Sequence, residues 1–446
     1  MNRMARLGVQ LLLGVILQAT LGDGHCRAEG KAPQAQDKQQ PVTLTIWIMP
    51  NGPGDNLENF VDLVKPFTAA HPHIKVEPTV LPWGEALNKI QDATRGGPAP
   101  DLTQLGTTWV AAIASTGKLL DLSGKYDEKL FPPQVLATTR IEGDPAFQGK
   151  RFAMPWIVDT RALYYNKAMC AKAGVDPKRD FANWTTFKVA LQKLKKVEVD
   201  GERVQPLGVP MSNWDIIHNL SWWIWGAGGG FVRDAASGES AINSPGTIAG
   251  LDYYIQLFRD GLVSAKADTL EAVAAADMLR KGEIATTIAF PIPSLPEDRF
   301  GIAAVPAGPK GAFTFLGGST IGVFKSSKHS EEAIALLKFL SSETAQVRYS
   351  TLTGLLPAAA AQYDELLLKL DPIRSAFVEQ MQHGRAYPSI VQWGDIELVL
   401  RDGLNAVWAI GKKPGRYDRA AVKSQLNQMA KKIDSIMQRP RATTNK

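Results

Sequence analysis

Alternating large apolar and polar residues predict three short strands near the start of the chain, with helical patterns between them. Residues 42–48 alternate in this way and stop at a turn-forming run, 50–55, that is rich in Pro, Gly and Asn, as a β-strand does. The segments 74–76 (Ile-Lys-Val) and 100–105 (Pro-Asp-Leu-Thr-Gln-Leu), each preceded by a helical pattern, predict two further strands. Strand, helix, strand, helix, strand predicts a parallel sheet covered by helices on both faces.

The first predicted helix follows that turn, with Asp55 placed to cap its N-terminus and Pro66 expected to shorten or kink its end. A second helix is expected from about Glu85. Ligands of such sheets bind beyond the carboxyl ends of the strands, which here are the loops around Asn51, Leu81 and Gly106. The apolar face of the first helix, recurring at helical spacing, is Leu57, Phe60, Val61, Val64 and Phe67.

The N-terminus has the pattern of a secretory signal. Arg3 and Arg6 precede an apolar run at 7–21, which is shorter than the ~20 residues of a membrane-spanning helix. Cleavage after Ala28 is expected, giving a periplasmic protein. A lipid anchor at Cys26 is the less favoured alternative, because residues 23–25 lack the Leu-small-small run of lipoprotein signals. Cys170 is then the only cysteine, which we interpret as structural.

The composition suits a large globular protein of two domains. Of the 446 residues, 45% are hydrophobic and 21% charged, and the formal net charge is +6. Loss of three arginines and one aspartate with the signal lowers that charge to +4, too mild to indicate nucleic acid as a partner. Residues 29–41 should form a disordered tether and residues 439–446 a flexible tail.

Motifs of enzymes and metal sites are mostly absent from the sequence. It has no Gly-rich phosphate loop ending in Lys-Ser or Lys-Thr, no His-Glu-x-x-His and no cysteine pair for zinc. The string Gly-Gly-Ser at 317–319 lacks the closing Gly of a serine-hydrolase elbow. We therefore expect no catalytic residue, no metal and no cofactor.

Several short strings, in a fixed order over nearly the whole mature chain, resemble the sugar-binding proteins of ABC importers, the solute-binding family that includes maltose-binding protein. An example is Ala-Pro-Asp-Leu at 99–102; each string is weak alone, and their shared order carries the resemblance. The strings lie at 67–76, 99–102, 149–156, 163–167, 183–187, 281–285, 315–319 and 353–357.

The resemblance implies an α/β fold of the two-lobed, type II periplasmic-binding-protein kind, a clamshell in which each lobe is a mostly parallel sheet flanked by helices. Three hinge crossings would divide the chain into lobe 1, at 42–155 plus 305–345, and lobe 2, at 156–304 plus 346–438. A mono- to trisaccharide or sugar derivative would bind in the cleft. The implied partners are this sugar and the membrane permease subunits of an ABC importer, and the protein would be a monomer.

Tryptophans are the most informative site candidates, because the chain has eleven of them, a high number for 446 residues, and the faces of indole rings stack on sugar rings. Trp83 follows a strand, and Trp109 lies where a helix begins. In the cluster at 214–225, Trp214 and Trp223 are favoured for sugar contact, while Trp222 and Trp225 share one helical face and are assigned to the core. The full set of predicted ligand contacts is Asn51, Trp83, Thr108, Trp109, Asp159, Arg161, Trp214, Trp223, Gly318, Ser319, Arg385 and Trp393.

Polar members of this set supply hydrogen bonds to hydroxyls. The resemblance implies a ligand-contacting residue just after the first crossing, at Asp159, whose other reading is a salt bridge to Arg161. It also implies a glycine-rich loop at Gly318 that approaches the sugar closely, and a basic position at Arg385, whose fork suits paired hydroxyls or a phosphate equally well.

Two other functions remain open from the sequence. A receptor for an anionic molecule or a phosphodiester would need cleft cations, for which Arg161 and Arg385 are the candidates. A secreted glycosidase would need two carboxylates flanking the sugar, and Asp159 has no obvious partner.

Overall fold

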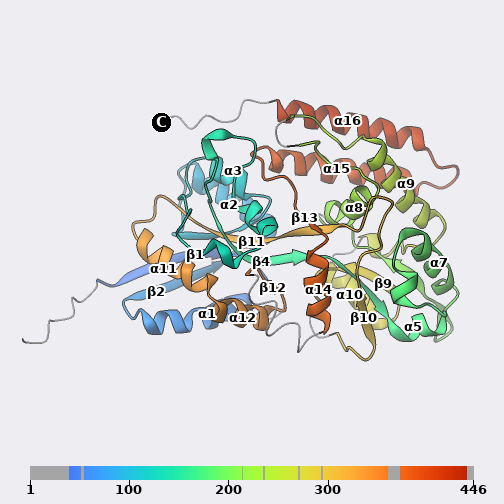
Figure 1. Cartoon of the computed structure of the whole chain (residues 1–446), viewed down its shortest axis with the longest axis horizontal. Helices are drawn as coiled ribbons and strands as arrows, with labels where there is room; N and C mark the ends of the chain where they lie inside the picture. The colour runs from blue at the N-terminus through green and yellow to red at the C-terminus, as the bar shows by residue number, and fades with distance from the viewer. Residues whose placement is uncertain are drawn as a thin grey trace, which may run out of the picture. The chain divides into compact units, whose positions relative to one another are not determined.

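A computed structural model describes residues 40–51, 55–212, 214–234, 237–269, 272–292, 295–359 and 372–438 (Figure 1). The predicted signal at 1–28, most of the tether at 29–41 and the tail at 439–446 lie outside these residues. Residues from Pro41 onward form one compact unit. None of the helices in the described part is both long and apolar enough to cross a membrane.

The first sheet has the strand order β12-β4-β11-β3-β1-β2, with β13 paired to β11. β1 is parallel to both β2 and β3, which confirms the sheet predicted for the N-terminal strands. β11 lies antiparallel between β3 and β4. The strands of this sheet are β1 (Val42–Ile48), β2 (Ile74–Val80), β3 (Leu102–Gly106), β4 (Met154–Thr160), β11 (Thr314–Val323), β12 (Leu356–Pro357) and β13 (Gly384–Arg385).

The second sheet has the order β10-β5-β9-β8. Only β8 and β9 are parallel in it, whereas β5 pairs antiparallel with β9 and β10, so this sheet is less parallel than predicted. A small hairpin, β6 (Glu198–Val199) with β7 (Glu202–Arg203), lies outside both sheets. The strands of the second sheet are β5 (Ala162–Asn166), β8 (Gln205–Gly208), β9 (Ile284–Ala289) and β10 (Phe300–Ala303).

Helices pack against both sheets and against one another. In Figure 1, α1 and α12 lie beside the first sheet, α5 and α7 lie beside the second, and the long α15 and α16 run side by side. α8 packs against α9 and α15. The helices are α1 (Asn56–Ala70), α2 (Trp83–Thr94), α3 (Val110–Ser115), α4 (Pro133–Leu136), α5 (Lys167–Lys172), α6 (Pro177–Asp180), α7 (Trp184–Leu194), α8 (Asp215–Gly226), α9 (Pro245–Arg259), α10 (Ala272–Lys281), α11 (Ser330–Ser341), α12 (Glu343–Thr353), α14 (Pro372–Met381), α15 (Trp393–Lys412) and α16 (Arg419–Met437).

The first helix was predicted correctly at its start, whereas the shortening expected at Pro66 does not occur. The Asp55 carboxylate accepts hydrogen bonds from the first-turn amides of α1, as expected of an N-cap. Pro66 lies inside the helix without ending it. Leu57 and Val61 are exposed, because the buried stripe is narrower than the predicted face and is centred on Phe60, Leu63, Val64 and Phe67.

The chain passes from the first sheet to the second between β4 and β5, and it returns between β10 and β11. The predicted lobe boundaries stay a prediction. The boundary at 155 falls within β4, which pairs with β11 along its length. The boundary at 345 falls within α12, which packs against α1. β4 and β11 are thus the strands next to both crossings, and they position the site.

Candidate functional site

The strand pair β4 and β11 is held tightly at Gly318. This residue has φ +128°, and a Cβ built on it would lie 2.1 Å from the carbonyl oxygen of Ile157. Glycine is therefore required by the approach of β4, a reason different from the predicted contact with a sugar. The Gly318 carbonyl accepts a 3.1 Å hydrogen bond from the Thr107 amide, which ties the loop after β3 to the strand pair.

A buried network of uncharged polar groups lies at the ends of β1 and β3. The Gln104 amide donates to Ser319 Oγ at 2.8 Å and to Asn51 Oδ1 at 3.1 Å. Asn51 in turn donates to the Tyr349 hydroxyl of α12 at 3.0 Å, and the Tyr349 ring stacks on Trp156. Asn51 and Ser319, both predicted site residues, are thus brought together by Gln104, and both are almost fully buried.

An indole pair stands beside this network. The Trp83 indole donates from Nε1 to the Pro50 carbonyl at 2.8 Å, which fixes the ring while leaving 40% of the residue exposed. Its centroid lies 5.5 Å from that of Trp109 in an edge-to-face arrangement. Trp109 covers Gly106, where a Cβ would lie 3.3 Å from the indole. Trp83 therefore offers an accessible aromatic surface, one property that sugar stacking requires.

A charged cluster lies at the end of β4 and at the start of α8. The Arg161 guanidinium contacts Asp159 at 2.5 Å and Asp215 at 3.6 Å, and its side chain is only 7% exposed. Its charge also lies over the rings of Phe290 and Phe315. Burial raises the pKa of Asp159, while the positive charge of Arg161 opposes that rise. The salt bridge foreseen as the alternative for Asp159 is therefore present; Arg161 is buried in it, while 30% of the Asp159 side chain is exposed.

Further residues beside this cluster were missed by the sequence analysis. His218 Nδ1 lies 2.9 Å from the Tyr387 hydroxyl, and the imidazole stacks on Phe315. Burial and the charge of Arg161 lower the pKa of His218 well below its usual value, so the ring is neutral. Asp215 and His218 are three residues apart and so share a face of α8, a spacing that could have indicated them.

Glu397 was also missed, although it lies one turn after Trp393 on α15. It is 5% exposed, and burial raises its pKa to about 7, while hydrogen bonding from Trp393 and Thr108 acts in the opposite direction. Thr108 belongs to the loop after β3. α15 therefore brings a buried carboxyl group to the loop that also carries Trp109.

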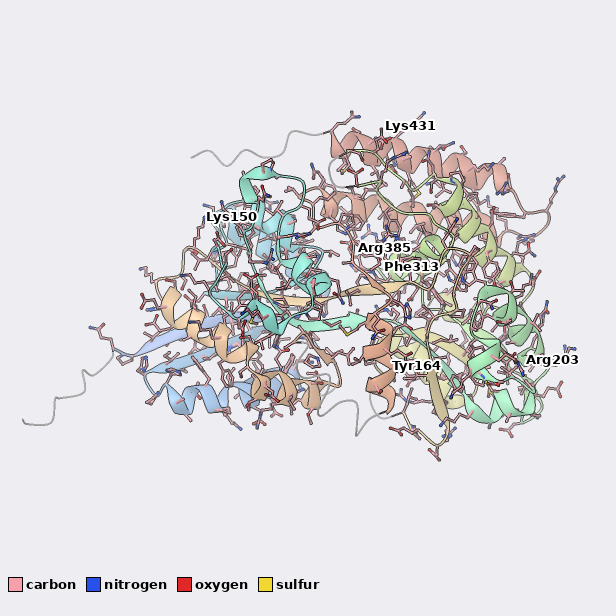
Figure 2. The ribbon with its side chains drawn as sticks, viewed as in Figure 1. Lys150, Tyr164, Arg203, Phe313, Arg385 and Lys431 are labelled. Atoms are coloured by element: carbon pink, nitrogen blue, oxygen red, sulfur yellow. The ribbon has the colours of Figure 1, made fainter. Side chains whose placement is uncertain are left out.

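Arg385 and Trp214, two further predicted contact residues, each form a cation–π contact. The Arg385 guanidinium lies over Trp225, 5.2 Å from the ring centroid, and Figure 2 shows Arg385 where β13 meets β11. Trp214 precedes α8 and is half-buried, with Arg401 over its ring. Burial lowers the pKa of Arg385.

Two predicted contact residues are packed in the core instead. Trp223 is fully buried among Trp184, Trp222 and two tyrosines, because α9 approaches so closely that a Cβ at Gly250 would lie 2.2 Å from the Trp223 carbonyl oxygen. Trp393 is fully buried and stacks on Tyr387. Trp222 and Trp225 are buried, as predicted.

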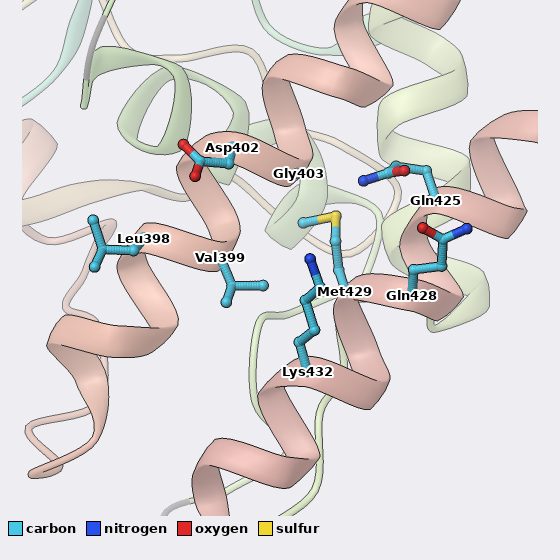
Figure 3. A pocket seen from close by; sticks show the side chains of 8 residues that line it. All are labelled: Leu398, Val399, Asp402, Gly403, Gln425, Gln428, Met429 and Lys432. Atoms are coloured by element: carbon cyan, nitrogen blue, oxygen red, sulfur yellow. The ribbon is translucent and has the colours of Figure 1, made fainter.

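A surface pocket of about 210 Å³ lies elsewhere, between α15 and α16 (Figure 3). No aromatic ring lines it, and it contains none of the site residues described above. Its walls offer no stacking surface for a sugar. The lining residues are Leu398, Val399, Asp402, Gly403, Gln425, Gln428, Met429 and Lys432.

Two α/β units joined through β4 and β11, with aromatic and polar side chains gathered beside these strands, define the class of two-lobed ligand-binding proteins. The chain belongs to the bacterial extracellular solute-binding protein family, whose model matches residues 53–347.

Individual relatives agree with this assignment. A protein of Brucella abortus named as a binding protein is 26% identical, over 85% of this chain and 90% of its own length. The diacetylchitobiose binding protein DasA of Streptomyces coelicolor is 28% identical, over 86% of this chain and 89% of its own length. Among solved structures, the GacH receptor of Streptomyces glaucescens, crystallised unliganded and with acarbose, superposes with a TM-score of 0.74 at 23% identity, covering 88% of this chain and 99% of the receptor. The predicted family and fold class are confirmed.

Proposed function

We propose that this protein binds a mono- to trisaccharide between its two lobes and delivers it to the permease of an ABC importer. The observation that supports the proposal is that two kinds of side chain suited to sugar binding lie near the strands that join the two sheets. The half-exposed Trp83, with Trp109, supplies a stacking surface, and the cluster of Asp159, Arg161 and Asp215 supplies hydrogen bonds for hydroxyl groups. DasA, named for diacetylchitobiose, and GacH, solved with acarbose, are relatives in keeping with it.

The proposal includes export, a monomeric state and the absence of catalysis. Export rests on the signal pattern of residues 1–28, with cleavage after Ala28. Asp159 and Asp215 share one guanidinium, an arrangement that suits the binding of hydroxyls better than attack on a glycosidic bond from two sides. A sugar recovered in cleaved form after long incubation with the protein would overturn this part.

A thermal-shift screen of the purified chain over mono- and oligosaccharides tests the binding. A ligand at 100 times its dissociation constant should add about 2.7 kcal/mol to the free energy of unfolding. Calorimetry with the best sugar should then find affinity weakened about 5- to 150-fold in Trp83→Ala, since base stacking on aromatic platforms contributes roughly 1–3 kcal/mol per ring. Val189→Ala, which shortens an exposed side chain of α7, is the control and should bind as the wild type does.

Wild-type affinity in Trp83→Ala would remove Trp83 from the site. The absence of any stabilising sugar in a broad screen would contradict the proposed function as a whole.

A further inference from the structure

The three charged side chains at the end of β4 and the start of α8 differ in their exposure to solvent. The Arg161 side chain is only 7% exposed, whereas 30% of the Asp159 side chain and 19% of the Asp215 side chain are exposed. The part of this cluster that solvent reaches therefore consists mainly of the two carboxylates, and the guanidinium lies behind them.

Arg161 is held in place by its backbone and by its side chain. Its carbonyl accepts a 2.8 Å hydrogen bond from Oγ1 of Thr314, the first residue of β11. Its guanidinium lies 5.4 Å from the ring centroid of Phe290 and 5.8 Å from that of Phe315. These rings attract the positive charge through their faces but offer no oxygen acceptor. Its anionic partners are the two carboxylates.

The two carboxylates come from different sides of the crossing between the sheets. Asp159 is next to the last residue of β4, and its Oδ1 accepts a 2.5 Å hydrogen bond from Arg161 Nη1. Asp215 is the first residue of α8, a helix that packs in one core with strands of the second sheet, and its Oδ1 lies 3.6 Å from Arg161 Nη2. Arg161 therefore reaches both sides through two different nitrogen atoms, which the single ammonium of a lysine could not do in the same way.

The Asp159 carboxylate has capacity for further hydrogen bonds. A carboxylate accepts up to about four of them, and within the described residues the Asp159 side chain accepts one, from Arg161. Sugar hydroxyls are suitable donors, and hydrogen bonds to an ionised acceptor are stronger than those between neutral groups. Two partly exposed carboxylates that share one buried cation thus suit a ligand that offers two hydroxyl groups.

We propose that Arg161 is a positioning residue of the sugar site and does not itself contact the ligand, a role that rests on the proposed function. It holds Asp159 and Asp215 at a fixed separation, so that the two carboxylates accept hydrogen bonds from two hydroxyl groups of the same sugar. Without the guanidinium, the like charges repel each other and this arrangement is lost. Asp215, which was not among the contact residues predicted from the sequence, is then a ligand contact, and Arg161, which was among them, acts through its two partners.

A double-mutant cycle, measured by calorimetry on the full chain at pH 7.5, tests this proposal. The probes are glucose, maltose, cellobiose and N,N′-diacetylchitobiose, together with any tighter ligand from the thermal-shift screen, and the tightest of them is used with every variant. Asp159→Asn and Arg161→Met should each weaken binding about 10- to 100-fold, because each removes a charge-assisted hydrogen bond or the geometry that it needs. In the Arg161→Met background, Asp159→Asn should weaken binding by no more than about twofold, since the carboxylate is no longer held in place.

Three further variants separate positioning from folding, which circular dichroism checks in each case. Asp215→Asn removes the second carboxylate and should also weaken binding about 10- to 100-fold. Arg161→Lys keeps the charge without the fork and should bind with an affinity between those of Arg161→Met and the wild type; it replaces Arg161→Met in the cycle if that variant does not fold. Arg151→Met removes another partly buried guanidinium, which pairs with Glu128 at 3.2 Å, and should bind as the wild type does.

Wild-type affinity in a folded Arg161→Met or Asp215→Asn variant would overturn the inference while leaving sugar binding intact. The same conclusion would follow if the losses from Arg161→Met and Asp159→Asn multiplied in the double variant, because Arg161 would then act independently of Asp159. If neither the four probes nor any sugar in the broader screen binds, the proposed function fails, and the role of Arg161 fails with it.

Discussion

Gly318→Ala tests the tight pairing of the two strands that connect the lobes. A Cβ at this position would lie 2.1 Å from the Ile157 carbonyl oxygen and 2.9 Å from the Val158 Cα, and the residue has φ +128°. Neither backbone atom can move away as a flexible side chain could. Backbone strain in a region open almost only to glycine costs about 1–3 kcal/mol, and overpacking costs a further 1–3 kcal/mol or so. We expect Gly318→Ala to lower the free energy of unfolding by about 2–6 kcal/mol.

Gly394→Ala is the matched control, because nothing lies within 4 Å of a Cβ built there and the residue is in α15. Alanine is favoured over glycine in helices, so this variant should be unchanged or more stable by up to about 1 kcal/mol. Urea denaturation followed by circular dichroism measures both variants. A Gly318→Ala variant as stable as the control would show that β4 and β11 separate easily and that their pairing does not require glycine at this position.

Three further outcomes are expected. Burial raises the pKa of Cys170 to about 12, so its thiol should react with Ellman's reagent only after unfolding, and Cys170→Ala should bind sugar as the wild type does. The hydrogen bond from Arg179 lowers the pKa of Asp180 from the usual 3.8 to about 2, so the ionised Asp180 should stabilise the fold fully above about pH 4 and lose this effect as the pH falls through 2. In Asp180→Asn, the free energy of unfolding should therefore fall less steeply between pH 4 and pH 2. The pKa of Glu397 is raised from 4.5 to about 7, so the folded state favours its protonated form and stability should fall by about 3 kcal/mol between pH 4.5 and 7. Glu397→Gln should remove that fall, as denaturation at a series of pH values would measure.

Features set by local sequence were predicted well. The bounds of β1 match the alternating pattern of residues 42–48, and Asp55 caps α1 through its own side chain. Assignment of Trp222 and Trp225 to the core followed from their helical spacing. Each of these depends on residues within a few positions of one another, which periodicity and capping rules can detect.

Features set by tertiary packing were predicted less well. The second half of α8 is buried on all sides, from Asn219 to Gly226, so spacing could not separate Trp223 from a helix face turned toward a ligand. The close approach of α9 at Gly250 decides the burial of Trp223. His218 and Tyr387 meet only because α8 packs against the segment before α15. No local pattern predicts that a glutamate on a long amphipathic helix lies beside the loop after β3.

The same strands that join the lobes also hold the polar site residues, and this gives the proposed function a mechanical basis. Asp159 pairs with Gly317 across β4 and β11, and two residues further along β11, Ser319 is bound through Gln104 to Asn51. Because Gly318 leaves no free space between β4 and β11, neither strand can move without the other. A sugar hydrogen-bonded to Asp159 or Ser319 would therefore act on both strands together. Ligand binding can therefore favour one arrangement of the lobes by its different contacts in the two arrangements, which is the requirement for a population shift. The exposed aromatic surface of Trp83 lies at the first residue of α2, away from the two crossing strands, whereas the charged groups lie directly beside them.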